Sequence, residues 1–190
     1  MSLYSIALFV HVTGAVLLFV AITVEGVALR LLQHAQTAAE ARSAAQLLRL
    51  NRMVGPLSAL GVLIPGLYMT ATTWGWVAWI LIALAAWALM AVFGAVNGMR
   101  IVALARSLAT ESGPITPAVR ARIGGPIFLV SWFARVGLAL GVVFLMTVKP
   151  GGVESATAIV LAAAGGLGAG AAISNRAQRH EKQAAPDRAA

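Results

Sequence analysis

Long apolar segments, separated by short polar ones, dominate the pattern of the chain. Each apolar segment is close to the roughly 20 residues that an α-helix needs to cross about 30 Å of hydrocarbon. The pattern therefore predicts an all-α fold, a polytopic membrane bundle of five transmembrane helices. We expect these helices over residues 5–32, 53–73, 76–99, 126–148 and 153–173.

The polar segments predict how these helices are joined. Residues 33–50 are rich in good helix formers and are expected to continue the first helix as a stalk. Only residues 72–75 separate the second and third helices, which predicts a tight hairpin. The hairpin is flanked by tryptophans of the kind that gather at membrane interfaces, Trp74, Trp76 and Trp79.

The last connector and the tail differ from the apolar segments in composition. Thr116 followed by Pro117 has the pattern of an N-cap with proline at the first helical position, so a short helix is expected there. Residues 175–190 are polar and are expected to form a disordered cytoplasmic tail. Residues 1–174 are then expected to form a single transmembrane domain.

Composition and charge support a membrane protein and indicate its orientation. The chain is 60% apolar and 11% charged, with a formal net charge of +8. The positive charge lies in two connectors and the tail, not in a basic stripe with interleaved aromatics, so nucleic acid is not an expected partner and the lipid bilayer is. By the positive-inside rule this distribution predicts an outer N-terminus and a cytoplasmic C-terminus.

Ionisable side chains inside the predicted spans are the first candidates for chemistry. His11 and Glu25 are 14 positions apart on the first helix, so they project from nearly the same side. Arg135 lies at an overlapping depth, about 6 Å from Glu25 along the membrane normal, and Asn97 is the most polar residue of the third helix. Glu25, Arg135 and Asn97 are therefore a predicted buried polar network, either a structural salt bridge or a proton or anion relay.

His11 is also a candidate ligand. Met69 and Met146 are expected near the same membrane face, and imidazole with thioether suits Cu(I) or haem iron. The alternative is that the methionines fill apolar gaps and His11 donates a hydrogen bond to a carbonyl of the next helix. The sequence leaves both interpretations open.

Small residues recur at a spacing that lets helix backbones approach each other closely. We expect these pairs to pack helices within the chain, and one of them could instead form a homodimer face. The pairs are Gly94 with Gly98, Gly137 with Gly141, and Gly166 with Gly170.

Several motifs of enzymes are missing from the sequence. It contains no Cys, no Gly-rich phosphate loop following a strand, no H-E-x-x-H and no G-x-S-x-G. We therefore expect no enzyme that depends on these motifs.

Four stretches resemble a known family: HVTGA from His11, RLNRMVGPLSALGVLIPGLYM from Arg49, SWFARVGLAL from Ser131 and FLMTVKP from Phe144. They resemble an uncharacterised family of small bacterial integral membrane proteins, similar in layout to the copper-resistance protein CopD and the HemJ-type protoporphyrinogen oxidases. The resemblance implies a multi-pass protein of the bacterial inner membrane with a functional histidine at His11. The lysine regarded as functional in the third helix of HemJ-type proteins has no match here.

Three classes of function follow from the sequence. The first is a protein that handles haem, porphyrin or copper through His11. The second is a small transporter or permeation element with Glu25 and Arg135 on a polar path. The third is a membrane scaffold or assembly partner without catalytic activity.

Overall fold

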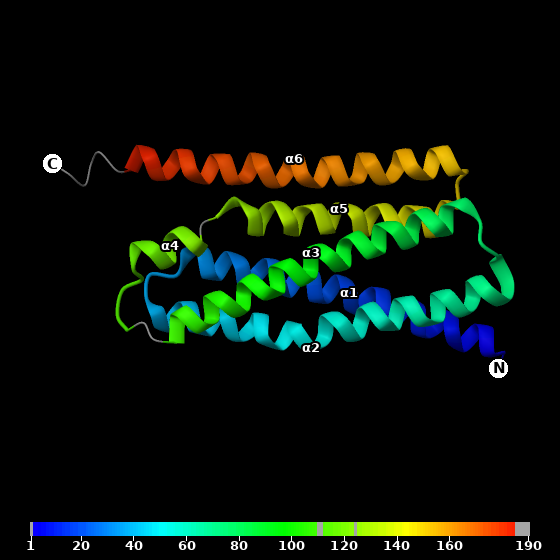
Figure 1. Ribbon diagram of the computed structural model, residues 1–190, viewed down its shortest axis with the longest axis horizontal. Helices are drawn as coiled ribbons and strands as arrows, with labels where there is room; N and C mark the ends of the chain where they lie inside the picture. Colours follow the sequence, from blue (N-terminus) through cyan, green and yellow to red (C-terminus); the bar gives the residue numbers. More distant parts are fainter. Residues whose placement is uncertain (1, 110–111, 124, 185–190) are drawn as a thin grey trace. The chain divides into compact units, whose positions relative to one another are not determined.

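Helices account for almost all of the structure. A computed structural model describes residues 2–109, 112–123 and 125–184. In chain order its elements are α1 (Leu3–His34), α2 (Ala38–Met69), a π-helical turn η1 (Thr70–Trp74), α3 (Ala78–Ala109), α4 (Pro117–Ile123), α5 (Pro126–Val148) and α6 (Gly152–Ala184) (Figure 1).

Five helical segments of the described residues are long and apolar enough to cross a membrane, as expected of a multi-pass membrane protein. These segments are Leu3–His34, Ala38–Trp74, Ala78–Ala109, Pro117–Val148 and Gly152–Arg176. The predicted all-α class and the number of apolar spans are confirmed.

Some helices have the predicted ends, and others continue beyond the apolar segment from which they were predicted. α5 has the predicted bounds, and α4 begins at Pro117 as predicted. α6 continues to Ala184, so residues 175–184 of the predicted disordered tail are helical. Residues 185–190 lie outside the described part of the chain.

The predicted stalk is wrong. α1 ends at His34, and Thr37 caps a new helix in which its hydroxyl accepts a hydrogen bond from the Glu40 N–H at 3.3 Å. The Glu40 carboxylate in turn accepts from the Gln36 N–H at 2.8 Å. This reciprocal pair is a form of the capping box, which starts helices and stops the chain from continuing α1.

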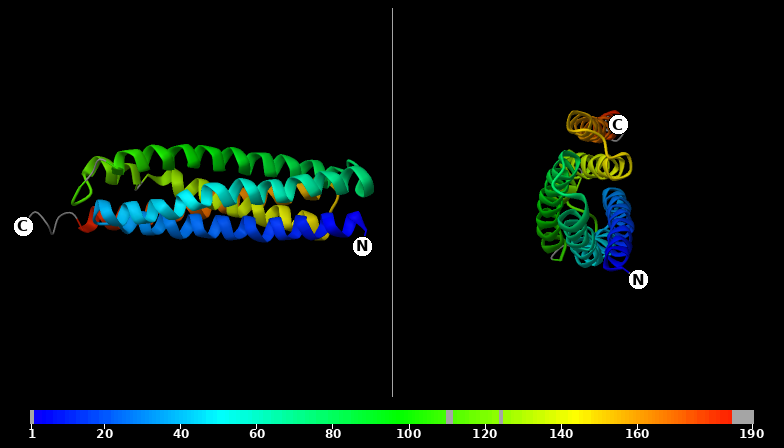
Figure 2. Two further views of the ribbon diagram at one scale, coloured as in Figure 1. Left: turned by 90° about the horizontal axis from the view of Figure 1, so that it is seen from below. Right: turned by 90° about the vertical axis from the view of Figure 1, so that its right-hand side faces the viewer.

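The described residues divide into two compact units, of which the first holds α1, α2, α4 and both ends of α3. α1 and α2 lie side by side in this unit (Figures 1 and 2). Their connection is held by backbone hydrogen bonds to the loop after α3. Ala38 N–H donates to the Gly113 carbonyl at 2.9 Å, and Ile115 N–H donates to the Gln36 carbonyl at 3.2 Å.

Two arginine side chains donate hydrogen bonds to backbone carbonyls at the same end of the first unit. Arg120 of α4 donates to the Ala35 carbonyl at 3.1 Å, and Arg42 of α2 donates to the Leu108 carbonyl at 3.3 Å. Carbonyls at the end of a helix have no intrahelical donor, so guanidinium groups there satisfy polar groups that the fold would otherwise leave unpaired.

At the other end of the first unit, the predicted tryptophan cluster is partly formed. The rings of Trp74 and Trp79 meet edge to face with centroids 6.0 Å apart. The Trp74 indole N–H also donates to the Tyr4 hydroxyl at 3.4 Å.

The closest approach between α1 and α2 is at Gly14. A Cβ at this position would lie 2.6 Å from the Gly61 carbonyl carbon and 2.8 Å from the Val62 nitrogen. Only a residue without a side chain lets the two backbones come so close.

The second unit contains the middle of α3 with α5 and α6. α5 and α6 pack side by side through the small residues that the sequence singled out (Figure 1). A Cβ at Gly137 would clash with the Ala162 carbonyl oxygen, and one at Gly166 with the Phe133 carbonyl oxygen. A Cβ at Gly170 would lie 2.7 Å from the Val130 Cα. These glycines therefore contribute to packing within the chain.

Replacing Gly14 tests the close approach of α1 to α2. We expect Gly14→Ala to destabilise the protein by about 1–3 kcal/mol, the usual cost of overpacking, because backbone atoms cannot move aside as a flexible side chain can. Gly165→Ala on α6 is the matched control, since a Cβ there meets nothing within 4 Å. Alanine is the better helix former, so this control should be neutral or slightly stabilising.

The measurement is unfolding of the purified protein in detergent, followed by circular dichroism. Equal effects of the two alanines would contradict the assigned contact.

Candidate functional site

Two buried polar side chains of the first unit are hydrogen-bonded to each other. The Asn97 Nδ2–H of α3 donates to Glu25 Oε1 of α1 at 3.4 Å. The exposed fraction is 5% for Glu25 and 1% for Asn97. These are two of the three residues in the predicted polar network.

Glu25 is buried because it shares a face of α1 with small and apolar residues that pack inward. The buried residues of α1 are Gly14, Ala21, Ile22, Glu25, Ala28, Leu29 and Leu32. They recur three and four positions apart, which is the spacing of one helix face. The carboxyl group is thus placed inside the protein by the same pattern that places the core.

Asn97 has an acceptor that the described residues leave without a hydrogen bond. Its Oδ1 atom is buried and has no donor among them. A buried amide oxygen without a donor costs free energy, so the atom can gain from any group that brings a proton or a positive charge. Among the described residues, the Glu25–Asn97 pair therefore keeps one buried acceptor without a donor.

Arg135, the third residue of the predicted network, lies on α5 in the second unit and is 8% exposed. Gly94 of α3 gives its guanidinium room, since a Cβ there would lie 3.4 Å from Nη1. Ser131, one turn before Arg135, is also buried. The pairing of Arg135 with Glu25 stays a prediction.

His11 is anchored to α2. Its Nδ1 lies 2.8 Å from the Val62 carbonyl oxygen, and a carbonyl can only accept, so Nδ1 carries the proton. Gly66 makes room for the ring, because a Cβ there would lie 3.1 Å from the Cε1 atom of His11. The neutral imidazole therefore has its unprotonated nitrogen at Nε2.

The other predicted ligands are divided between the units. Met69 is buried on α2, one turn beyond Gly66, in the same unit as His11. Met146 is half-buried on α5 in the second unit. Within the described residues, no three side chains among His, Cys, Asp and Glu come together as a metal site.

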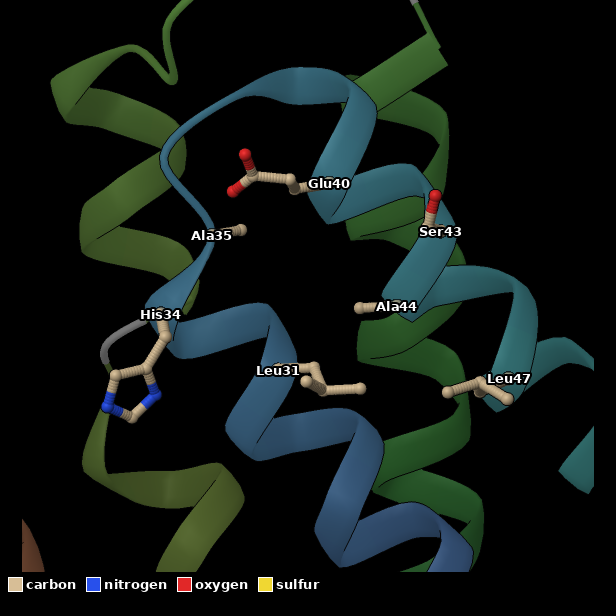
Figure 3. Close-up of a pocket in the computed structure, with 7 residues that line it drawn as sticks. All are labelled: Leu31, His34, Ala35, Glu40, Ser43, Ala44 and Leu47. Atoms are coloured by element: carbon tan, nitrogen blue, oxygen red, sulfur yellow. The ribbon is translucent and has the colours of Figure 1, made fainter.

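The first unit also contains a groove that the sequence did not predict. It lies where α1 ends and α2 begins and has a volume of about 370 Å³. Its lining residues are Leu31, His34, Ala35, Glu40, Ser43, Ala44 and Leu47 (Figure 3). The capping box at Thr37 was a signal for the turn that forms this groove, but no pattern in the sequence indicated the groove itself.

Comparison of the chain with protein-family models, with curated proteins and with solved structures gives no match. The resemblance to the CopD and HemJ-type proteins stays a prediction.

The His11 hydrogen bond can be tested by substitution. His11→Ala should lower stability by roughly 0.6–2 kcal/mol, the range for interhelical hydrogen bonds in membranes. His11→Asn should recover most of this loss, because the asparagine Nδ2 takes nearly the place of Nδ1 and can donate to the Val62 carbonyl.

Unfolding of both variants in the same detergent measures the difference. Equal stability of the alanine variant and the parent protein would contradict a contribution from this bond.

Proposed function

We propose that this multi-pass membrane protein moves protons across the membrane through the carboxyl group of Glu25, with Asn97 as its hydrogen-bonding partner. An ionisable group within an apolar span is costly and typically marks an ion or proton pathway. The observation that carries the proposal is the buried Glu25–Asn97 hydrogen bond beside an amide oxygen that has no donor among the described residues.

The amide of Asn97 suits a carboxyl group that changes its protonation state. An ionised carboxylate only accepts hydrogen bonds, and it takes the Nδ2–H of Asn97. A protonated carboxyl can donate, and the Oδ1 atom is an acceptor on the same side chain. Asn97 can therefore pair with Glu25 in both states, after a rotation of its amide.

A flux measurement tests the proposal. Protein in liposomes that contain a pH-sensitive dye should admit protons when a potassium diffusion potential is applied. Glu25→Gln should reduce the rate at least tenfold, because the glutamine keeps the shape and the hydrogen bond to Asn97 but cannot take up a proton.

Glu154→Gln is the matched control, since it removes a carboxylate from the exposed first turn of α6 and should change the rate less than twofold. A parent protein that admits no more protons than protein-free liposomes would contradict proton transport and favour a scaffold. A Glu25→Gln variant with the parent's rate would remove Glu25 from the path.

His11 supports a second candidate function, the binding of haem, porphyrin or copper. The bond from Nδ1 to the Val62 carbonyl leaves Nε2 unprotonated, and metal-binding histidines commonly have this support from their other nitrogen. The thioether of Met69 on the same helix as Val62 is a suitable second donor. A bound haem or Cu(I) would supply electron transfer, while the protein would hold it and set the orientation of the ring.

The His11→Asn variant separates this candidate from a purely structural histidine. Asparagine keeps the donor to Val62 and removes Nε2, so the variant should lose a Soret band or bound copper while it keeps most of the parent's stability. A parent protein whose spectrum and metal content do not change when haem or Cu(I) is added would contradict the ligand role.

The orientation is part of the proposal. Basic residues lie in the segments from Arg30 to Arg52 and from Arg100 to Arg122, which contain the turn after α1 and the loop after α3, and this favours a cytoplasmic position for these segments. We infer an outer N-terminus in a bacterial inner membrane.

Reporter fusions after Pro150 and after Asn175 should consequently be found on opposite sides, the first periplasmic and the second cytoplasmic. Both fusions on one side would contradict a span by α6.

Oligomerisation is the remaining proposal. Gly137, Gly141, Gly166 and Gly170 approach residues of this chain, whereas a Cβ at Gly98 meets nothing within 4 Å. Gly94 faces the Arg135 guanidinium of the same chain, so of the predicted positions we propose Gly98 for a homodimer face.

A further inference from the structure

We propose that residues 113–123, the end of the loop after α3 together with α4, form a strap that holds an apolar gate closed between Glu25 and one end of the first unit. At this end α1 and α3 end and α2 begins, since the turn after α1 is hydrogen-bonded to the loop after α3. Release of the strap would let water, and with it protons, reach Glu25. The proposal rests on proton transport by Glu25 and adds how access to Glu25 is controlled.

In the described parts of α1 and α3, only apolar side chains are buried between the Glu25–Asn97 pair and this end. On α1 the buried residues after Glu25 are Ala28, Leu29 and Leu32, and on α3 those after Asn97 are Ile101, Leu104 and Leu108. They recur three and four positions apart, so they continue the helix faces on which Glu25 and Asn97 lie. We call the four leucines of this set the apolar gate.

The apolar gate is inaccessible to water in the closed structure. The exposed fractions are 2% for Leu29, 1% for Leu32 and 0% for Leu108. The buried residues of α2 at the same end are also apolar, namely Ala38, Ala41, Ala44 and Leu48. Hydrophobic constrictions act as gates because ions do not pass them until water enters. Buried polar side chains of the described residues therefore offer a proton at Glu25 no route to this end.

Hydrogen bonds attach the strap to the turn between α1 and α2. Gly113 and Ile115 make backbone bonds of 2.9 and 3.2 Å with residues 36–38. The Arg120 guanidinium of α4 donates to the Ala35 carbonyl at 3.1 Å. None of these bonds lies within a helix, so they can break while α1 and α2 stay intact.

The strap is connected to the apolar gate through both α1 and α3. Ala35 follows Leu32 by three residues, so Arg120 holds the chain one turn after a gate leucine. The strap begins five residues after Leu108, whose carbonyl accepts from Arg42 at 3.3 Å. α4 also contacts α1 and is packed through side chains that are each 4% exposed, Val119 and Ile123. Movement of the strap would therefore move the backbone at the gate.

A single introduced thiol measures access past the gate, because the chain has no cysteine. Ala28→Cys places a sulfur at a position that is 0% exposed, on the turn between Glu25 and Leu32. A charged methanethiosulfonate should label this thiol slowly in the full-length protein in nanodiscs. Arg120→Met keeps most of the side-chain length but has no donor for the Ala35 carbonyl, so it should speed the labelling at least fivefold.

Arg122→Met is the matched control for the loss of charge and of a long side chain. Arg122 is exposed on the same short helix, two residues after Arg120. This substitution should change the labelling rate less than twofold.

A disulfide that fixes the strap tests the opposite change. Thr37 and Pro114 form an antiparallel bridge flanked by the two backbone bonds. Residues in such a pair have Cα atoms about 4.5 Å apart, a distance that a disulfide can span. With Thr37→Cys and Pro114→Cys together, oxidation should reduce the proton flux into liposomes at least tenfold, and dithiothreitol should restore it. Each substitution alone should leave the flux insensitive to the oxidant.

Equal labelling of Ala28→Cys with and without Arg120→Met would overturn the strap, whatever the proton flux is. The same is true if Arg122→Met speeds the labelling as much as Arg120→Met, or if oxidation of the double cysteine variant leaves its flux unchanged. Faster labelling after Arg120→Met, in a protein whose parent moves no protons, would contradict transport by Glu25 and support the gate as a barrier to water.

Discussion

The contact between the backbones of α1 and α2 at Gly14 and Gly61 determines much of the first unit. Because no side chain separates the helices there, polar groups one turn away come within hydrogen-bonding distance, as His11 does with the Val62 carbonyl at 2.8 Å. In hydrocarbon such a bond matters, since water is not present to replace it. The small residue Gly14 therefore allows the close approach that lets the polar His11 bond to α2.

Pro65 lies beside this contact and explains why α2 can offer polar groups to its neighbour. Proline has no N–H, so the carbonyl of Gly61, four residues earlier, loses its helical donor. Transmembrane helices tolerate such prolines where neighbouring helices cover the freed groups. Gly14 of α1 covers this point of the backbone, and His11 bonds to the next carbonyl.

The hydropathy pattern was sufficient for the number of apolar spans and for the bounds of α5, because long apolar segments have few alternative structures. It was insufficient for residues 33–50, where helix propensity alone predicted a continuation of α1. The local signal that decides this case is the Thr37-x-x-Glu40 capping box, whose paired hydrogen bonds begin a new helix. Propensity says that a segment can be helical, whereas capping residues determine where a helix begins.

For the candidate site, the sequence predicted which residues are involved but not how they are arranged. The cost of burying a charge pointed to Glu25, and Asn97 was noted as the most polar residue of the third helix; the two share a hydrogen bond. The direction of each side chain and its partner could not be predicted, because they depend on how helices distant in the sequence pack. The groove beside Glu40 had no sequence signature for the same reason, since it is formed by residues of two helices that meet only in the fold.

The buried polar groups differ in how fully the described residues satisfy their hydrogen bonds. The Nδ1 of His11 and the hydroxyl of Ser58 have backbone carbonyl partners, so these two atoms are satisfied within the protein. Asn97 differs because its amide binds Glu25 on one side and keeps a buried acceptor on the other. A purely structural role would favour a side chain with no polar atom left over. The free acceptor of Asn97 therefore supports the proposal of proton transport through Glu25, because the same amide can accept from a protonated carboxyl and donate to an ionised one.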